Sequence, residues 1–289
     1  MNRYVDLHLH STCSDGLHPP AAVVAMAAGL GLAAIAIADH DNIDGIDAAM
    51  AAGAAHGVEV LSGVELSVIW QGYDDIHLLG YGFDHHQEKL RHDLTAFQDF
   101  RARRNEMIVE RVNEKLAAEG RGAIDFAVVR EKAGGTVGRP HIAMALVEAG
   151  IVTDSEAAFN RYLIPCNVAK RDFPIAEAIA LIHSAGGVAV LAHPPFITSD
   201  RRLLTQMVEI FAGMGLDGLE AWNCGADNLT VDQTITLARR QGLIVTGGTD
   251  FHGTDGEKMI FGGVRGNLRI PYRCVEEIRE RCQQRQGER

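Results

Sequence analysis

An Asp-Leu-His-Leu-His segment at residues 6–10 constrains this chain more than any other feature of its sequence. The segment closes a short apolar run that begins at Tyr4, a pattern typical of a β-strand. Because alternate side chains of a strand share a face, His8 and His10 point the same way. Two imidazoles on one face, followed in the next loop by Asp15, form half of a metal site. A histidine pair can also belong to a core or a surface, so the prediction depends on ligands elsewhere in the chain.

Strand-like and helix-like segments alternate through most of the chain. Apolar runs predict seven strands, near 4–10, 32–38, 58–64, 76–81, 188–192, 218–222 and 243–247. Helices are predicted between several of them, near 21–28, 46–56, 175–185, 201–214 and 228–241, and Gly186 and Gly242 follow two of these as C-cap residues do. Near-continuous aliphatic strands indicate a parallel sheet covered on both faces. Since a closed sheet has no exposed edges, seven such units favour an α/β barrel.

Residues 89–171 depart from this pattern. A long helix is predicted at 93–119, with charged residues including Arg104 along one side, and shorter helices near 125–132, 140–148 and 154–161. No strand is predicted there, so we interpret 89–171 as a helical insertion that covers the substrate. Residues 1–88 and 172–289 then form the barrel domain. A charged helix near 275–289 is expected to be solvated surface.

Composition excludes several classes of protein. The net charge of −11 argues against a general nucleic-acid coat, although a local basic pocket remains possible. The five cysteines are scattered and form no Cys-x-x-Cys pair, which favours a reducing cytoplasm over a disulfide framework, and we expect no secretory signal. Residues 21–38 carry no charge over a length that approaches a membrane span, but Gly29, Gly31 and the Asp-His-Asp at their end favour a helix and a strand. We therefore expect a cytoplasmic protein without membrane contact.

Polar side chains recur at the ends of the predicted strands. In α/β barrels the loops after the strands converge at one rim, so residues distant in sequence meet there. The candidates are six histidines and three carboxylates: His8, His10, His40, His77, His193, His252, Asp15, Glu65 and Asp250. Any one of them could be structural, His77 in the core, Glu65 at the surface or His193 in a turn. Their repetition at successive strand ends favours a common site.

The number and chemistry of these residues favour a multinuclear site. A tetrahedral ion takes four ligands, so this set could serve two or three ions if Glu65 bridges them. Imidazole and carboxylate suit Mn²⁺, Fe²⁺ or Zn²⁺ without distinguishing them. Cys13 lies between His10 and Asp15, but the nitrogen and oxygen ligands are sufficient without a thiolate.

The same motifs resemble the PHP (polymerase and histidinol phosphatase) family of the amidohydrolase superfamily. They are His-x-His at the N-terminus, Asp-His after the second strand, Gly-Val-Glu after the third, Ala-His-Pro after the fifth and Asp-x-His after the seventh. The resemblance extends from Tyr4 to about Gly253. The resemblance implies a distorted (β/α)7 barrel, TIM-barrel-like, with a trinuclear centre, most often of Mn²⁺. It assigns one ion to His8, His10, Glu65 and Asp250, a second to Glu65, His77 and His193, and a third to Asp15, His40 and His252. No ligand is missing, which argues against an inactive member.

Three further segments resemble a subgroup of that family. They are residues 39–45, Gly-Arg-Pro-His at 138–141 and residues 165–170. Its members resemble nucleoside 3′,5′-bisphosphate phosphatases, some of which act as 5′→3′ exoribonucleases on short RNA. In such a site a bound cation brings the pKa of water to roughly 7. We expect Glu65, Asp15 and His193 to hold this metal-bound water for attack on phosphorus; the general acid is not identified.

A second substrate phosphate needs cations away from the metal ions. Arg139 precedes Pro140 at a predicted helix start, and helix N-termini attract anions, so Arg139 is expected to clamp a 5′-phosphate. The full set of expected substrate contacts is Arg139, Lys170, Arg171, His141, Asn223 and Asn42. Surface or packing roles remain alternatives for each. Trp222 could stack on a base or belong to the core.

The predicted function is hydrolysis of the 3′-phosphate of nucleoside 3′,5′-bisphosphates by a metal-bound hydroxide. Alternatives are a 5′→3′ exoribonuclease, a phosphatase of the histidinol phosphate type and a non-catalytic, metal-stabilised interaction module. A pocket closed by the insertion favours the phosphatase, and an open basic groove favours the exoribonuclease. The expected partners are a nucleotide or short RNA, without DNA-specific binding and without an obligate protein partner.

Overall fold

The computed structural model describes residues 3–133, 137–169, 173–223, 225–253 and 269–287. Its strands form one sheet in the order β7-β6-β5-β4-β3-β2-β1-β8. Their bounds are β1 Tyr4–Leu9, β2 Ala34–Ile37, β3 Glu59–Trp70, β4 Tyr73–Tyr81, β5 Val188–Leu191, β6 Gly218–Trp222, β7 Ile244–Gly247 and β8 Ile270–Pro271. This arrangement agrees with the predicted distorted barrel.

The two ends of the strand series meet between β1 and the segment after β7. The Asp250 amide donates to the His8 carbonyl at 2.9 Å, and the His10 amide donates to the Phe251 carbonyl at 2.9 Å. Gly248 lies at this seam, where a Cβ atom would fall 2.1 Å from the His8 Cβ. Only glycine allows the two backbones to approach this closely. The seam brings the ends of the first and last long strands together.

One part of the strand prediction is wrong. The predicted parallel strand at 58–64 continues to Trp70, turns at Gln71 and Gly72, and returns as β4 antiparallel to β3. Gln71 and Gly72 both have positive φ, at 45° and 87°, which is the geometry of a tight hairpin turn. β4 is also antiparallel to β5. His77 is therefore the middle residue of an antiparallel strand, yet it reaches the rim where the parallel strands end.

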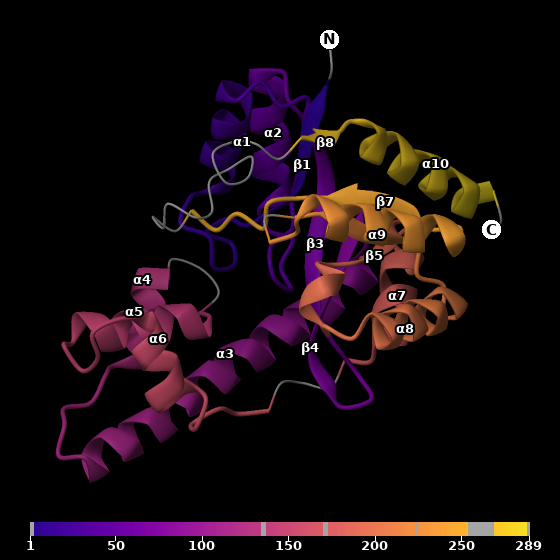
Figure 1. Ribbon diagram of the computed structural model, residues 1–289. Helices are drawn as coiled ribbons and strands as arrows, with labels where there is room; N and C mark the ends of the chain where they lie inside the picture. The colour runs from indigo at the N-terminus through magenta and orange to yellow at the C-terminus, as the bar shows by residue number, and fades with distance from the viewer. Residues whose placement is uncertain (1–2, 134–136, 170–172, 224, 254–268, 288–289) are drawn as a thin grey trace.

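Helices surround the sheet and agree with the prediction to within a few residues (Figure 1). They are α1 Pro20–Gly29, α2 Ile46–His56, α7 Ile175–Ser184, α8 Arg201–Gly213, α9 Asn228–Arg240 and α10 Arg273–Gly287. Asp200 and Asp227 cap α8 and α9 by accepting hydrogen bonds from first-turn amides. The expectation that α10 is solvated surface is wrong. Its Cys274, Val275 and Ile278 are buried against the barrel, because an apolar stripe lies within a mostly charged sequence.

A helical segment follows β4. It comprises α3 Glu88–Ala118, α4 Phe126–Ala133, α5 Arg139–Glu148, α6 Ser155–Ala158 and a π-helical turn at Phe159–Leu163. The start of α3 packs on the barrel core through Leu90, Leu94 and Phe97. Its far half carries α4, α5 and α6, which share a separate hydrophobic cluster with it (Figure 1). Among the described residues, no helix combines the length and apolar composition needed to cross a bilayer.

Candidate metal centre

Glu65 lies at the centre of the predicted ligands. It is 1% exposed, and five imidazole nitrogens approach its carboxylate oxygens to within 3.4 Å. The distances are 3.4 Å from His8 Nε2, 3.3 Å from His10 Nε2, 3.0 Å from His40 Nδ1, 2.9 Å from His77 Nδ1 and 3.2 Å from His193 Nε2. These histidines come from four strands or strand ends, β1, β2, β4 and β5, so the barrel places them around one carboxylate, as expected for a bridging ligand.

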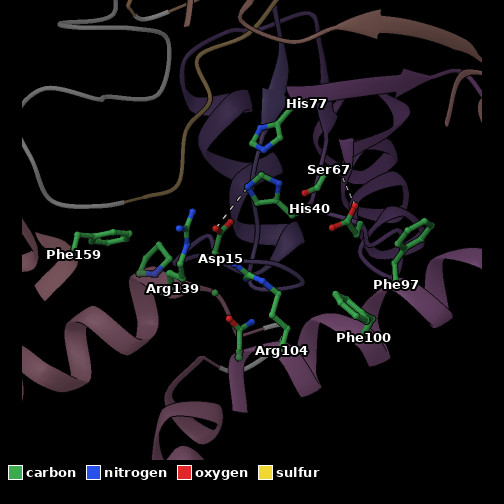
Figure 2. Close-up of a pocket in the computed structure, with 13 residues that line it drawn as sticks. Asp15, His40, Ser67, His77, Phe97, Phe100, Arg104, Arg139 and Phe159 are labelled. Carbon is green, nitrogen blue, oxygen red and sulfur yellow. Dashed lines mark hydrogen bonds and ion pairs between the residues drawn. The ribbon is translucent and has the colours of Figure 1, made fainter. Parts of the chain in front are cut away.

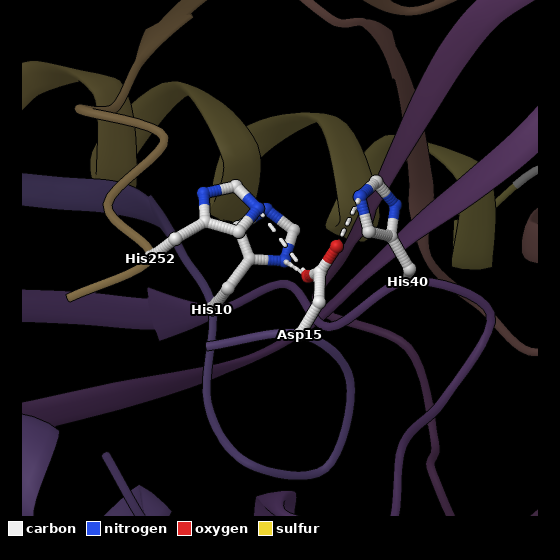
Figure 3. A group of neighbouring side chains, drawn as sticks. All are labelled: His10, Asp15, His40 and His252. Atoms are coloured by element: carbon white, nitrogen blue, oxygen red, sulfur yellow. Dashed lines mark ion pairs between the residues drawn. The ribbon is translucent and has the colours of Figure 1, made fainter. Parts of the chain in front are cut away.

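Eight of the nine predicted ligands form three overlapping groups of metal-binding type. One group, His8, His10, Glu65 and Asp250, is the set expected for the first ion. A second contains the expected Asp15, His40 and His252 together with His10. Figure 3 shows Asp15 between His40 on one side and His10 and His252 on the other. The third contains His40, Glu65 and His77, whereas the expected third partner, His193, approaches Glu65 from a neighbouring position.

Unpartnered polar atoms show that the cluster suits bound cations. Among the described residues, five buried atoms of the cluster have no hydrogen-bond partner: His8 Nε2, Asp15 Oδ1, His40 Nδ1, Glu65 Oε2 and His77 Nδ1. A buried polar atom without a partner costs about 1–3 kcal/mol. Five such atoms that face one another are explained if divalent cations complete their coordination. The residues present therefore fit the metal ions implied by the family resemblance.

The carboxylates of the cluster favour their ionised form. Burial alone would raise the pKa of Glu65, but His77, His40 and His8 outweigh it and hold that pKa well below its usual range. Burial likewise opposes ionisation of Asp15 and Asp250, and neighbouring imidazoles lower the pKa of each. Three ionised carboxylates in a buried site require compensating positive charge, which metal ions supply.

The imidazoles respond to the same carboxylates. Burial lowers the pKa of His10, but Asp250 and Glu65 raise it to about 10. Burial also opposes protonation of His8, but Glu220 and Glu65 raise its pKa well above the usual value. Burial opposes protonation of His193 as well, and Glu65 raises the pKa of that residue. For His40 burial prevails and the pKa is lowered. The electrostatic field at the cluster thus attracts cations.

Two buried carboxylates outside the predicted set hold the cluster in place. Glu220 of β6 accepts from His8 Nδ1 at 2.9 Å and from the His193 amide at 2.8 Å. It thereby directs His8 Nε2 toward Glu65, as carboxylates do for metal-binding histidines. Asp39 accepts from the Ser11 amide, the Ser11 hydroxyl and the Ser14 hydroxyl at 2.6–2.7 Å, which fixes the loop that carries Asp15. In the sequence, Glu220 is a carboxylate within an otherwise apolar strand, and this pattern could have indicated its supporting role.

Backbone strain accompanies three of the strand ends. Asp41, His193 and Asp250 have φ values of 51°, 28° and 55°, in the left-handed region that non-glycine residues seldom adopt. Such conformations persist where surrounding contacts impose them, and they occur often at functional sites. Here they follow β2, β5 and β7, at the rim that carries the cluster.

A cavity of about 270 Å³ opens beside the cluster. On the barrel side it is lined by Asp15, His40 and His77, and on the helical side by Phe97, Phe100, Arg104, Arg139 and Phe159 (Figure 2). Arg139 is the first residue of α5, and its guanidinium carbon lies 5.8 Å from the centre of the Phe159 ring. Arg139 is therefore where the sequence analysis expected a phosphate contact, at a helix start facing the predicted ligands.

Four residues of α3 line this cavity and were not predicted from the sequence: Phe97, Phe100, Arg104 and Asn105. Phe97, Phe100 and Arg104 follow an i, i+3, i+7 pattern, which places them on one face of the helix. The interpretation of Arg104 as part of a charged helix surface is wrong. Arg104 is 7% exposed, its Nε donates to the Val168 carbonyl and its Nη2 donates to Asn167 Oδ1, both at 2.8 Å.

The other expected substrate contacts have varied positions. Asn42 links two loops, donating to the Cys13 carbonyl in the loop after β1 and accepting from the Asp44 amide in its own loop. His141 Nδ1 accepts from the Gly138 amide and lines a separate cavity of about 90 Å³. Lys170 and Arg171 lie outside the described residues.

Asn223 and Trp222 lie at the end of β6. Asn223 is 3% exposed and its Nδ2 has no hydrogen-bond partner among the described residues. Trp222 packs against two hydrophobic clusters, which favours its core role over stacking on a base.

The sequence matches the PHP domain family over residues 6–163, and its relatives match most of its length. The chain belongs to the PHP domain family. It is 37% identical over 265 residues to a 5′-3′ exoribonuclease of Haemophilus influenzae, covering 87% of this chain and 91% of that protein. It is 34% identical over 253 residues to a 3′,5′-nucleoside bisphosphate phosphatase of Chromobacterium violaceum, covering 86% of this chain and 87% of that protein.

Solved structures resemble this PHP chain over most of their length. One, proposed to be a metal-dependent phosphoesterase from Bifidobacterium adolescentis, has a TM-score of 0.80 at 30% identity and covers 96% of this chain and 95% of its own. Another, an amidohydrolase from Chromobacterium violaceum with bound sulfate and no metal, has a TM-score of 0.78 at 31% identity and covers 89% of each chain. The family and fold predicted from the strand-end motifs are confirmed.

Proposed function

We propose that this metal-dependent phosphoesterase removes the 3′-phosphate from nucleoside 3′,5′-bisphosphates, giving nucleoside 5′-monophosphates and phosphate. The observation that carries this proposal is the cavity beside the Glu65 cluster, which has Arg104 and Arg139 on its helical side. At about 270 Å³ it is small among ligand cavities, which suits one nucleotide. The phosphatase name of the Chromobacterium relative supports the same substrate.

We propose that the three ligand groups hold two or three divalent ions, Mn²⁺ first among them, with Zn²⁺ and Fe²⁺ as alternatives. When bound, such ions acidify water and neutralise charge on phosphoryl oxygens. We assign to Glu65, Asp15 and His193 the role of orienting the attacking water; the 3.2 Å contact of His193 with Glu65 supports the pairing of these two. Glu220 keeps His8 and the His193 backbone in position for the same purpose.

The helical segment provides the second half of the substrate site in this proposal. We infer that residues 89–171 form a substrate cap on a barrel domain made of residues 1–88 and 172–289. Arg139, with the N-terminus of α5, binds the 5′-phosphate, because a guanidinium offers paired donors to phosphate oxygens. Arg104 adds fixed positive charge to the same cavity. Phe97 and Phe100 supply an apolar wall for the nucleoside and exclude water from it.

A 5′→3′ exoribonuclease activity on 5′-phosphorylated short RNA is the second candidate. It is favoured by the name and 37% identity of the Haemophilus relative. A nucleotide or short RNA is thus the proposed partner in either case. We also propose a cytoplasmic location, which suits the free thiols of Cys13, Cys166, Cys274 and Cys282.

A substrate panel with added Mn²⁺ tests the proposal. It contains nucleoside 3′,5′-bisphosphates, 3′- and 5′-monophosphates, 5′-phosphorylated di- and trinucleotides, and histidinol phosphate. We expect phosphate release from the bisphosphates at the highest kcat/KM, loss of activity after chelation and recovery when Mn²⁺ is restored. Preference for a 5′-monophosphate or for histidinol phosphate would contradict the proposed substrate, and full activity after chelation would contradict the metal dependence.

A further inference from the structure

Phe196 is an exposed aromatic residue next to the candidate metal centre. Its side chain is 66% exposed, more than any other large hydrophobic side chain in the part of the chain that the structure describes. It ends the short 3₁₀ helix Pro194–Phe196, which directly follows His193. The ring centres of Phe196 and His193 lie 5.9 Å apart at a tilt of 56°. An aromatic ring left in water beside a reactive site suggests a ligand that covers it.

The Phe196 ring is held in place by its surroundings. Its Cζ atom abuts Gly225, where an added Cβ atom would come within 2.2 Å of it. Pro194 and Pro195 restrict the backbone on its N-terminal side. The edge of the ring is therefore held at Gly225 while the residue stays mostly exposed, which is the arrangement of a stacking surface.

A buried hydrogen-bond donor accompanies this ring. Asn223 Oδ1 accepts from the Gly225 amide at 3.0 Å, which fixes the side-chain amide beside the residue that supports Phe196. Asn223 Nδ2 is buried and has no hydrogen-bond partner among the described residues. A buried donor without a partner is costly unless a ligand or water uses it. The pair offers an apolar face and a donor, which suits a nucleotide.

Phe196 and Asn223 follow strands other than those that supply the barrel side of the nucleotide cavity. The barrel side of that cavity is formed by residues that follow or belong to β1, β2, β3 and β4, such as Asp15, His40, Ser67 and His77. Phe196 instead follows β5, and Asn223 follows β6. A substrate with one nucleotide in the cavity and its 3′-phosphate at Glu65 would direct its next nucleotide toward β5 and β6.

We propose that Phe196 stacks on the base of the nucleotide that follows the scissile phosphate, and that Asn223 Nδ2 donates to the same nucleotide. This inference rests on the proposed function and extends its substrate class to 5′-phosphorylated oligoribonucleotides. The chemistry is unchanged: a water oxygen bonds to phosphorus, the P–O3′ bond breaks, and O3′ gains a proton. The phosphate then remains as the 5′-phosphate of the following nucleotide. A nucleoside bisphosphate is the case in which that nucleotide is absent.

The inference is limited to one nucleotide beyond the scissile phosphate. A groove of about 610 Å³ begins at Pro195 and runs between α8 and α9. It carries Arg201 and Arg240, but also Glu209 and Asp232, so its formal charges cancel. A longer RNA backbone would gain no net attraction there, because phosphate binding depends on an excess of Lys and Arg.

The test compares a nucleoside 3′,5′-bisphosphate with a 5′-phosphorylated dinucleotide in the full chain loaded with Mn²⁺. Phe196→Ala should lower kcat/KM for the dinucleotide about tenfold or more, the effect of losing one base–aromatic stack, and leave the bisphosphate unchanged. Phe196→Trp should retain dinucleotide cleavage, since it keeps a stacking surface. Leu30→Ala, at a residue that is 55% exposed at the end of α1, is the matched control and should alter neither substrate.

The outcomes separate this inference from the proposed function. Equal losses on both substrates, or no loss on either, would overturn the stacking role of Phe196. A wild-type enzyme that cleaves the bisphosphate but not the dinucleotide would also overturn it, while the proposed function would stand. A wild-type enzyme that cleaves neither would overturn the proposed function itself.

Discussion

His8 Nδ1 lies 2.9 Å from Glu220 Oε1, and both side chains are fully buried. The contact connects β1 to β6 across the barrel, over 212 positions of sequence. It fixes which imidazole nitrogen of His8 faces Glu65, and the second oxygen of Glu220 holds the His193 amide. A fully buried residue thereby sets the geometry of two candidate ligands.

Glu220→Gln should weaken metal binding while the fold is retained. The amide keeps the shape of the side chain but loses the charge that orients and polarises His8, and supporting residues of this kind contribute about 10- to 100-fold to metal affinity. Isothermal titration of the metal-free protein with Mn²⁺ measures the effect. Glu209→Gln, at an exposed position on α8, is the control. Equal affinities in Glu220→Gln and wild type would contradict the orienting role.

The candidate ligands were accessible from the sequence because their signals are local. His8 and His10 share a face through the two-residue period of a strand, and the barrel then brings other strand ends to them. Glu65 and Asp250 followed from the same rule. The resulting groups in the structure differ from the expected assignment only in how His10, His40 and His193 are shared.

What the sequence did not reveal depends on contacts between distant segments. The burial of Arg104 requires Asn167 and Val168, more than sixty positions away. The reversal of β4 depends on two residues with positive φ, Gln71 and Gly72, within a sequence that also suits a loop between parallel strands. Helical periodicity and strand alternation carry no information about either.

Arg139→Ala should separate binding of the 5′-phosphate from the chemistry at the 3′-phosphate. A charge-assisted hydrogen bond is worth about 1.5–3 kcal/mol, so kcat/KM for a nucleoside 3′,5′-bisphosphate should fall roughly 10- to 100-fold. The same variant should cleave a nucleoside 3′-monophosphate nearly as well as wild type does, because that substrate has no 5′-phosphate. Steady-state kinetics on both substrates measure this. A parallel fall on both would show that Arg139 does not act on the 5′-phosphate.

Gly248→Ala should destabilise the barrel at the seam between β1 and β7. The added Cβ would meet the His8 backbone nitrogen at 2.3 Å, so the two segments must separate. We expect a loss of about 2–3 kcal/mol in the free energy of unfolding, measured by urea denaturation. Gly213→Ala on α8 is the matched control, since its Cβ would meet nothing within 4 Å. A stability equal to that of the control would show that the seam tolerates the separation.

Asp217 should make stability depend on acid pH. Burial alone would raise the pKa of Asp217, but hydrogen bonds from His183, Arg285 and the Ala189 amide outweigh it and lower that pKa. A lowered folded-state pKa means that the ionised group stabilises the protein above the unfolded-state pKa of about 3.9. That contribution is lost as the pH falls below about 3.9 and through the lower pKa that Asp217 has in the folded state.

Asp217→Asn should therefore cost about 2 kcal/mol at neutral pH, the size of its charged hydrogen bonds. The difference in unfolding free energy between wild type and variant should stay constant from pH 7 to about pH 5 and shrink below pH 4. Urea denaturation across this range measures it. Asp232→Asn, at an exposed position on α9, should follow wild type at every pH. A gap that widens on acidification would contradict the sign of the pKa shift, because only a raised pKa gives that behaviour.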